Sequence, residues 1–314
     1  MTTPLRIGTR GSPLAMWQAR FVAELLRPHA GPRHVEIVQI ETTGDLIRDV
    51  ALAKIGGDGL FTKEIQRALL ANSVDVAVHS LKDLPTTYVE GLLLAAVPAR
   101  GPTGDAFVSH RHQSFDALPS GAMVATGSLR RRAQILHRRP DLRLVDIRGN
   151  VETRLRKLQE QPELDAIILA EAGLIRLGLQ GTVTAILDSQ WMLPAVGQGA
   201  LGLECRAGDD VTRSLLEPLN DPSTRQAVLA ERALLRGLGG GCQVPIGAAA
   251  MVQDANLAIR GVVLDPLGQQ RIAAEGSGPA SDAEQIGGRL AEQLLQQGAR
   301  ALLVAGGALP TPLR

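Results

Sequence analysis

A lysine and an aspartate stand side by side in the run His79-Ser80-Leu81-Lys82-Asp83. The apolar run Val74–Val78 predicts a strand just before them, and the ends of strands in open α/β sheets are common ligand sites. A carboxylate in such a place can stabilise a positive charge or accept N–H hydrogen bonds. Elsewhere a Lys-Asp pair is usually a surface ion pair, and that alternative stays open here.

Arginine dominates the basic residues and is concentrated in one stretch. Only four of the 33 basic residues are lysines, and from Arg130 to Lys157 ten basic residues face three acidic ones. The planar guanidinium suits bidentate binding of carboxylate or phosphate. Two turns between a strand and a helix, at 126–132 and 148–154, carry these arginines and should converge on one crevice. The stretch predicts an anion site, with a solvated basic helix face as the alternative.

The two cysteines stand in different surroundings. Three glycines precede Cys242, and such a loop favours an exposed thiol to which a group could be attached. Cys205 ends an apolar run and is typical of a small buried hydrophobic residue. Two cysteines cannot form a disulfide framework, and these two lack metal-ligand spacing, so no metal site is predicted.

Two further glycine-containing loops are of interest. Gly8–Ala15 places Arg10 and Ser12 between an expected strand and an expected helix, where free backbone N–H groups can bind an anion, although an ordinary turn fits as well. The loop Gly56–Gly59 contains Asp58 and is not followed by the Gly-Lys-Ser/Thr of a phosphate-binding loop. It is predicted to be a flexible lid.

The elements that must position these residues alternate between strand and helix over the first two hundred residues. This alternation predicts two α/β blocks with parallel sheets. We expect strands at 5–8, 35–40, 74–78, 123–126, 142–147 and 165–169, and helices at 14–26, 61–70, from 128 onward and at 151–158.

The blocks are separated by two Gly/Pro-rich hinges, at 99–104 and 194–199. After Pro222 the pattern changes to α+β, with helices expected at 223–238 and 282–297 and strands at 246–252, 257–264 and 271–274. The predicted domains are lobe 1 (1–100 with 199–218), lobe 2 (104–194) and a third domain (222–314).

Composition excludes several classes of function. The 314 residues provide two or three domains, and 45% hydrophobic with 21% charged residues is typical of a soluble globular chain. A net charge of +1 and 2% aromatic residues argue against a nucleic-acid binder. No apolar run reaches the roughly 18 residues of a membrane span, and no secretory signal is visible. We therefore expect a cytoplasmic protein.

Seven motifs in order resemble those of the hydroxymethylbilane synthase, or porphobilinogen deaminase, family over essentially the whole chain. They are Thr9–Ala15, Ala77–Asp83, Ser128–Arg131, Arg148–Val151, Leu193–Gly199, Glu231–Ala233 and Gly240–Gly247.

The resemblance implies a transferase of porphyrin and haem biosynthesis that joins four porphobilinogens head to tail, releasing ammonia and a linear hydroxymethylbilane. It implies two periplasmic-binding-protein-like lobes with hinge crossovers and a smaller α+β domain. It also implies a dipyrromethane cofactor held by a thioether to Cys242. The chemistry fits, since each pyrrole carries two carboxylates, and loss of ammonia leaves an azafulvene-like cation that a carboxylate can stabilise.

The resemblance also assigns roles to individual residues. Asp83 matches the catalytic carboxylate. Two departures from the family pattern are Asp58 in the lid and Gly127, where a serine is common. Besides Cys242, the residues matched to the cofactor are Lys82, Thr126, Ser128, Arg130, Arg131 and Arg148, and those matched to the substrate are Arg10, Ser12, Arg154, Arg176 and Gln198.

Two alternatives come from other classes of protein. A non-catalytic anion-binding protein could use the same two-lobed fold, because a fold does not determine a function. Purified protein without bound pyrrole would favour it. A nucleic-acid binder using the arginine-rich stretch would have to bind DNA or RNA at low salt. The expected partner is porphobilinogen, with no nucleic acid and no membrane, and the protein is expected to be a monomer.

Overall fold

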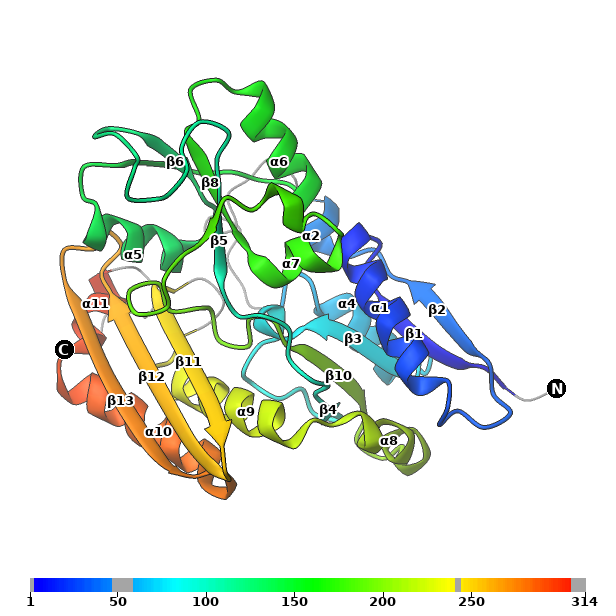
Figure 1. Cartoon of the computed structure of the whole chain (residues 1–314). Helices are drawn as coiled ribbons and strands as arrows, with labels where there is room; N and C mark the ends of the chain where they lie inside the picture. Colours follow the sequence, from blue (N-terminus) through cyan, green and yellow to red (C-terminus); the bar gives the residue numbers. More distant parts are fainter. Residues whose placement is uncertain (1–2, 47–58, 241–243, 306–314) are drawn as a thin grey trace.

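Three β-sheets organise the part of the chain that the structure, a computed structural model, describes: residues 3–46, 59–240 and 244–305 (Figure 1). Two five-stranded sheets with helices packed on them form lobes 1 and 2. The third, a three-stranded sheet, belongs to the third domain. The sheets lie within the predicted domains, whose limits of 1–100 with 199–218, 104–194 and 222–314 stay a prediction.

Lobe 1 is built on a sheet in the order β2-β1-β3-β10-β4. Helix α1 covers β1 and β3, and its buried positions recur at helical spacing, as the sequence predicts. The strands are β1 (Leu5–Thr9), β2 (Val35–Gln39), β3 (Val76–Ser80), β4 (Leu92–Ala96) and β10 (Leu201–Arg206). The helices are α1 (Pro13–Leu26), α2 (Thr43–Leu46), α4 (Lys63–Leu70), α8 (Asp210–Leu216) and the 3-10 turns η1 (Leu81–Asp83) and η3 (Glu217–Leu219).

Lobe 2 repeats this architecture with the order β7-β6-β8-β5-β9. Hydrophobic clusters around Phe107 and around Ile167 form its core. The strands are β5 (Asp105–Val108), β6 (Met123–Ala125), β7 (Arg143–Val145), β8 (Ala166–Ala170) and β9 (Ala185–Ile186). The helices are α5 (Leu129–Arg138), α6 (Val151–Glu160), α7 (Glu171–Arg176) and the 3-10 turn η2 (Gln180–Thr182).

Neither sheet is purely parallel, which corrects the expectation from the sequence. In lobe 1, β10 runs antiparallel to both of its neighbours, and in lobe 2 the same is true of β5. Each reversed strand is the first one after a hinge. The chain enters the lobe there from the other lobe, instead of through a helix that returns it to the start of the sheet. The strands β4, β5, β9 and β10 were not predicted.

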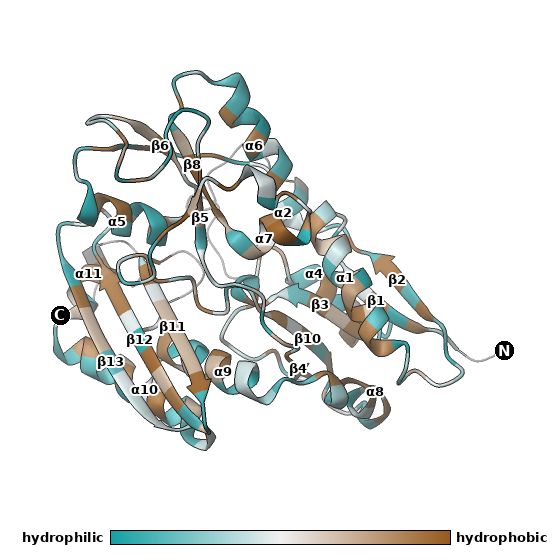
Figure 2. Cartoon of the chain, in the orientation of Figure 1, coloured by the Kyte–Doolittle hydropathy of each residue, from teal (hydrophilic) through white to brown (hydrophobic). Residues whose placement is uncertain are grey.

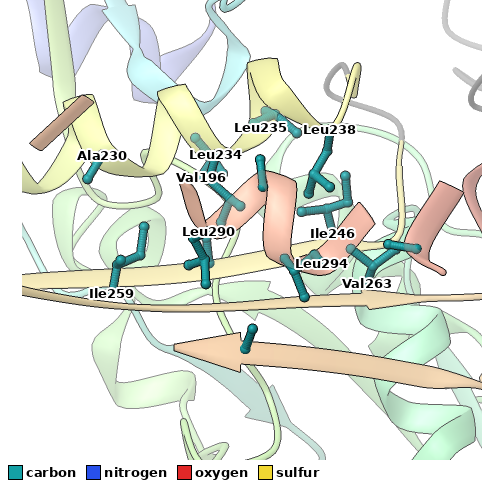
Figure 3. Packing of buried hydrophobic residues seen from close by; sticks show 14 of the residues in the cluster. Val196, Ala230, Leu234, Leu235, Leu238, Ile246, Ile259, Val263, Leu290 and Leu294 are labelled. Atoms are coloured by element: carbon teal, nitrogen blue, oxygen red, sulfur yellow. The ribbon is translucent and has the colours of Figure 1, made fainter. Parts of the chain in front are cut away.

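The third domain is α+β, as expected. Its antiparallel sheet is covered by α9 and α10, and hydrophobic residues recur along these elements (Figure 2). Their apolar side chains meet in one core (Figure 3). Val196 of the second hinge joins this core (Figure 3). The elements are α9 (Pro222–Gly237), β11 (Ile246–Gln253), β12 (Asn256–Leu264), β13 (Arg271–Pro279), the 3-10 turn η4 (Ala280–Asp282), α10 (Ala283–Gln296) and α11 (Ala299–Ala305).

The two predicted hinge segments, 99–104 and 194–199, lie against each other between the lobes. The N–H of Gly101 donates to the carbonyl of Gly199 at 3.1 Å. Gly199 has a φ of +83°, and a Cβ atom there would lie 2.5 Å from the carbonyl oxygen of Gly101. A glycine at this position therefore lets the crossings pass in contact. No helix among the described residues is long and apolar enough to cross a membrane.

Candidate active site

The predicted site residues follow the carboxyl ends of parallel strands in both lobes. Helix α1 of lobe 1 contacts α7 of lobe 2, so the two strand ends meet between the lobes (Figure 1). This is where open α/β sheets bind ligands. Arg10 and Ser12 follow β1, Lys82 and Asp83 follow β3, Thr126 and Ser128 follow β6, Arg148 follows β7, and Arg176 ends the helix after β8.

Short polar side chains determine where the helices at this edge begin. Ser128 accepts a hydrogen bond from the N–H of Arg131 and caps α5, and Asn150 accepts one from Thr153 and caps α6. Ser12 caps α1 in the same way. Because a capping hydroxyl uses its oxygen as acceptor, its O–H can still donate to a ligand.

A buried carboxylate lies at the centre of the lobe 2 arginines. Asp105 accepts hydrogen bonds from Arg130 at 2.6 Å, from Arg131 at 2.8 Å and from Gln198 at 2.9 Å. Arg130 and Arg131 are only 4% and 5% exposed. Burial alone would raise the pKa of Asp105, but the two guanidinium groups hold it well below its usual range. Asp105 is therefore ionised and neutralises part of the arginine charge.

The cluster around Asp105 still has unused polar atoms. Among the described residues, Nε of Arg130 and Oε1 of Gln198 are buried without a hydrogen-bond partner. Buried polar atoms normally have partners, so such atoms point to a ligand. Thr126, four positions before Arg130, is also buried, and its hydroxyl accepts a hydrogen bond from the N–H of Ser128 at 3.2 Å.

Lys82 and Asp83 form the turn η1 directly after β3. Burial lowers the pKa of Lys82 to about 8; Arg131 also lowers it, whereas Asp83 and Asp105 oppose the shift. Lys82 of lobe 1 therefore interacts electrostatically with Arg131 and Asp105 of lobe 2. Within the described ranges, the carboxylate of Asp83 makes no hydrogen bond and no ion pair. It is half-buried and can accept hydrogen bonds from a ligand.

Two further arginines bring charge to the space between the lobes. Burial lowers the pKa of Arg154 to about 10, with Arg131 and Arg148 acting in the same direction and Asp83 opposing. Arg176 donates to the carbonyl of Gly199 at 2.6 Å, and burial lowers its pKa to about 10. Both therefore remain charged at neutral pH.

Arg148 is half-buried, and burial lowers its pKa. It belongs to the same group of charges, since it acts electrostatically on Arg154. Arg10 stands apart from this group because a lobe 1 carboxylate holds it. Its guanidinium lies 2.5 Å from Asp45 and 4.1 Å from the ring centroid of Phe61.

The histidine and the serine of the His79–Asp83 run take part in packing. His79 is buried, with its Nε2 atom 3.0 Å from Oε2 of Glu204 on β10. Ser80 exchanges hydrogen bonds with the side chain of Gln18 on α1. In the run His79–Asp83, the histidine and the serine are thus engaged in packing, and the carboxylate of Asp83 is left for a ligand.

Some predicted features lie outside the described residues, namely Cys242 and Asp58. Cys205 is fully buried, and burial raises the pKa of its thiol to about 11, which confirms its packing role. No group of three His, Cys, Asp or Glu side chains in the described ranges could hold a metal ion.

Sequence reasoning missed the carboxylates that hold the arginines. Asp105 is separated from Arg130 by 25 positions, and Asp45 from Arg10 by 35. For Asp105 a signal existed, because it is an acidic residue that opens the fully buried run Ala106–Val108 directly after a hinge. A buried acid needs a cationic partner, and the arginine-rich turns could supply one.

Comparison with known proteins now adds to this geometry. The family description "Porphobilinogen deaminase, dipyromethane cofactor binding domain" matches residues 5–214, and "Porphobilinogen deaminase, C-terminal domain" matches residues 225–296. The chain belongs to the porphobilinogen deaminase family. It is 50% identical over 312 residues to the porphobilinogen deaminase of Syntrophotalea carbinolica, covering 99% of both chains.

Within the porphobilinogen deaminase family, the cofactor-binding domain corresponds to both lobes and hinges of this chain, where the described site residues lie. The C-terminal domain corresponds to the third domain and contains Cys242. Among solved structures, the chain is similar to the methionine-binding protein MetQ, with 13% identity, a TM-score of 0.44 and coverage of 72% and 92% of the two chains. It is also similar to a periplasmic substrate-binding protein of an ABC transporter from Coxiella burnetii, with 16% identity, a TM-score of 0.43 and coverage of 72% and 94% of the two chains.

Proposed function

We propose that this member of the porphobilinogen deaminase family joins four porphobilinogens head to tail with Asp83 as its catalytic carboxylate. The observation that carries the assignment is a half-buried carboxylate with no hydrogen bond or ion pair among the described residues, although it interacts electrostatically with Lys82 and Arg154. The product is the linear hydroxymethylbilane of tetrapyrrole synthesis, and ammonia leaves at each step.

Asp83 suits this chemistry because the reaction passes through positive charge. When porphobilinogen loses ammonia, a cation develops on the pyrrole, and a fixed carboxylate stabilises it. The same carboxylate can accept hydrogen bonds from pyrrole N–H groups and so orient the ring. Lys82, next to it in η1, keeps a positive charge available for the carboxylates of the growing chain.

The residues of the two lobes fit a dipyrromethane cofactor. Its carboxylates need buried cationic donors, and the buried Nε of Arg130 is such a donor without a partner among the described residues. When bound, the cofactor supplies the pyrrole to which the first porphobilinogen is joined. We propose that Cys242 holds it covalently and that Lys82, Thr126, Ser128, Arg130, Arg131 and Arg148 bind it.

The incoming substrate carries carboxylates of its own. The charge and half-buried position of Arg154 and Arg176 support a role in binding them. Gln198 has a free buried acceptor among the described residues. We propose that Arg10, Ser12, Arg154, Arg176 and Gln198 contact the porphobilinogen that arrives.

Two measurements test these assignments separately. Intact mass should exceed the sequence mass by one dipyrromethane, and Cys242→Ser should remove the excess while Cys205→Ser keeps it. Asp83→Asn keeps the shape of the side chain and removes its charge, so turnover should fall by about 100-fold or more in folded protein. Unmodified wild type would overturn the role of Cys242, and near-normal turnover of Asp83→Asn that of Asp83.

We further propose a cytoplasmic monomer that binds no nucleic acid. The near-neutral net charge and the few aromatic residues support the absence of nucleic-acid binding. Light scattering coupled to size exclusion should give the mass of one chain, 33.2 kDa plus the cofactor. A dimer mass, or retention on DNA at low salt, would contradict this proposal.

A further inference from the structure

One face of helix α9 follows the segment Leu81–Tyr88, which contains the proposed catalytic carboxylate. Val228, Arg232 and Arg236 are spaced four residues apart, so they lie on the same face. Val228 is buried in a cluster with Leu84. The guanidinium carbon of Arg236 lies 6.0 Å from the ring centroid of the tyrosine that ends the segment. A helix of the third domain thus lines a segment of lobe 1.

Arg232 makes the most specific of these contacts. Its Nη1 donates to the carbonyl of Leu84 at 3.0 Å and its Nη2 to the carbonyl of Pro85 at 2.8 Å. These are the first two carbonyls after Asp83, and Arg232 is 3% exposed. A planar guanidinium can hold two successive carbonyls at once, whereas the point charge of a lysine has no such fork.

The position of Asp83 depends on the backbone on both sides of it. Its carboxylate has no partner of its own among the described residues, so no side-chain contact holds it. On the upstream side, the N–H of Leu81 donates to the carbonyl of Ala200 at 3.0 Å. On the downstream side, Arg232 holds the chain from another domain. Loss of this contact removes the hydrogen bonds that hold the downstream side and leaves the packing of Leu84 against Val228.

Helix α9 is itself fixed in place by the residue next to Arg232. Glu231 is fully buried and accepts two hydrogen bonds from Arg100 of the first hinge, at 2.8 and 2.9 Å. It also accepts from the N–H of Gly197 in the second hinge at 2.8 Å and from that of Ala250 on β11 at 2.9 Å. The helix therefore gives Arg232 a rigid support.

We infer that Arg232 is a positioning residue that holds in place the backbone carrying Asp83. Cys242 follows the last residue of α9 by five positions, so the same helix leads to the proposed thioether and grips the segment of the carboxylate. This inference rests on the proposed function, which assigns the roles of Asp83 and Cys242. Arg232 touches neither the substrate nor the reacting atoms; it acts through the backbone that carries Asp83.

The test compares Arg232→Gln with a matched control on the same helix. Arg225 also donates from α9 to lobe 1 carbonyls, those of Leu94 and Ala95, but these lie on β4 and not beside Asp83. Arg232→Gln should keep the dipyrromethane by intact mass and lower kcat by about 100-fold, the loss that a small misplacement of a reacting group can cause. KM for porphobilinogen should change by about twofold or less. Arg225→Gln should lower the melting temperature with kcat nearly unchanged.

A double-mutant cycle separates positioning from general loss of structure. If Arg232 acts through Asp83, then Arg232→Gln should cause little further loss of turnover in an Asp83→Asn background. If Arg232 had a purely structural role, the fold-losses in turnover of the two single variants would multiply in the double variant. Should Arg232→Gln yield no folded protein, Arg232→Lys, which keeps the stem and the charge, takes its place in the same cycle.

The outcomes separate this inference from the proposed function. An Asp83→Asn variant with strongly reduced but measurable turnover, and losses that multiply in the double variant, would overturn only the inference, as would an Arg232→Gln variant with normal kcat. An active Asp83→Asn would overturn the catalytic role of Asp83 and the inference together. Coupled losses, with the cofactor retained and Arg225→Gln active, would support the inference.

Discussion

The two arginine-bearing turns of lobe 2 look alike in sequence and differ in the structure. Both follow a parallel strand and open a capped helix. Arg130 and Arg131, on the first turn of α5, are buried and share the carboxylate of Asp105. Arg154, on α6, is half-buried and donates from Nε to the carbonyl of Gly149, with no carboxylate partner among the described residues.

This difference separates two uses of the same residue type. A guanidinium that already shares a carboxylate keeps its direction and donates to a ligand only with its remaining N–H groups. A guanidinium without an internal carboxylate has its full charge to offer. The α5 arginines thus provide preorganised donors with reduced net charge, and Arg154 provides attraction. A ligand that carries several carboxylates can use both.

Removal of the shared carboxylate should have the largest effect. Asp105→Asn leaves two buried guanidinium groups without their counter-charge, and breaking a buried ion pair costs about 3–5 kcal/mol. Asp116→Asn is the control, because Asp116 is 70% exposed in its pair with Arg138 and should change the free energy of unfolding by about 0.5 kcal/mol or less. Urea denaturation of both variants measures this. Equal costs would show that the α5 arginines do not depend on Asp105.

Arg154 should respond in the opposite way, with a large effect on binding and a small one on stability. Arg154→Gln removes a charge-assisted contact of about 1.5–3 kcal/mol to a substrate carboxylate, so KM should rise by about 10- to 100-fold. The free energy of unfolding should fall by about 1 kcal/mol or less. Arg156→Gln, on the same helix but 65% exposed and 3.6 Å from Glu160, should leave KM unchanged. A similar KM for both variants would remove Arg154 from the substrate site.

Local features of the fold were predictable from the sequence. Helix α6 begins at Val151 as expected, and α1 begins one residue before the predicted position. Helical periodicity and capping residues act over a few positions and can be recognised in one sequence. The direction of β5 and β10 could not be found this way, because it depends on where the hinges return the chain to each sheet.

The sequence predicted which charged residues belong to the site, but it predicted less well which of them pair with one another. The arginine-rich turns indicated an anion site, and the family resemblance assigned the individual roles. The role of Asp105 required the fold, since it lies 25 positions from Arg130. The same holds for Arg232, whose carbonyl partner at Leu84 is 148 positions away. Contacts between residues so far apart in the sequence leave no local sequence pattern from which they could be predicted.

A pH profile can distinguish the lysine of the site from its arginines. With the pKa of Lys82 near 8 and that of Arg154 near 10, only Lys82 loses its charge between these values. The grip on the carboxylates of the cofactor and growing chain should therefore weaken above pH 8, and kcat should fall by up to about tenfold per pH unit. Lys82→Arg should flatten this fall, because the arginine stays charged. An unchanged profile in that variant would assign the titration to another group.

The lowered pKa of Lys82 also makes the free energy of unfolding depend on pH. Between pH 8 and 10.5 the unfolded chain binds the proton and the folded chain does not, so stability should rise with pH across this window. Below pH 8 the cost of burying the charge is fully present. Lys82→Met should remove this pH dependence in denaturation experiments without ligand.

The smallest effect is expected at Gly127, which precedes the cap of α5 and stands where the family commonly has serine. A Cβ atom there would lie 3.0 Å from the carbonyl oxygen of Ile147, so the turn must move by a few tenths of an ångström. Gly127→Ser should therefore lower the free energy of unfolding by about 0.5 kcal/mol or less, within the range of surface substitutions. The added hydroxyl would stand near the start of α5, whose arginines already share the charge of Asp105. As one more donor to the ligand, it should slow the loss of substrate-bound intermediates about twofold, the effect of a neutral hydrogen bond of about 0.5 kcal/mol.

Gly127→Ala is the control, because it has the same contact with Ile147 and no hydroxyl. If both variants lose intermediates at the same rate, the added hydroxyl makes no hydrogen bond to the ligand. The α5 arginines and Ser128 would then already supply all the donors that the ligand accepts next to this turn.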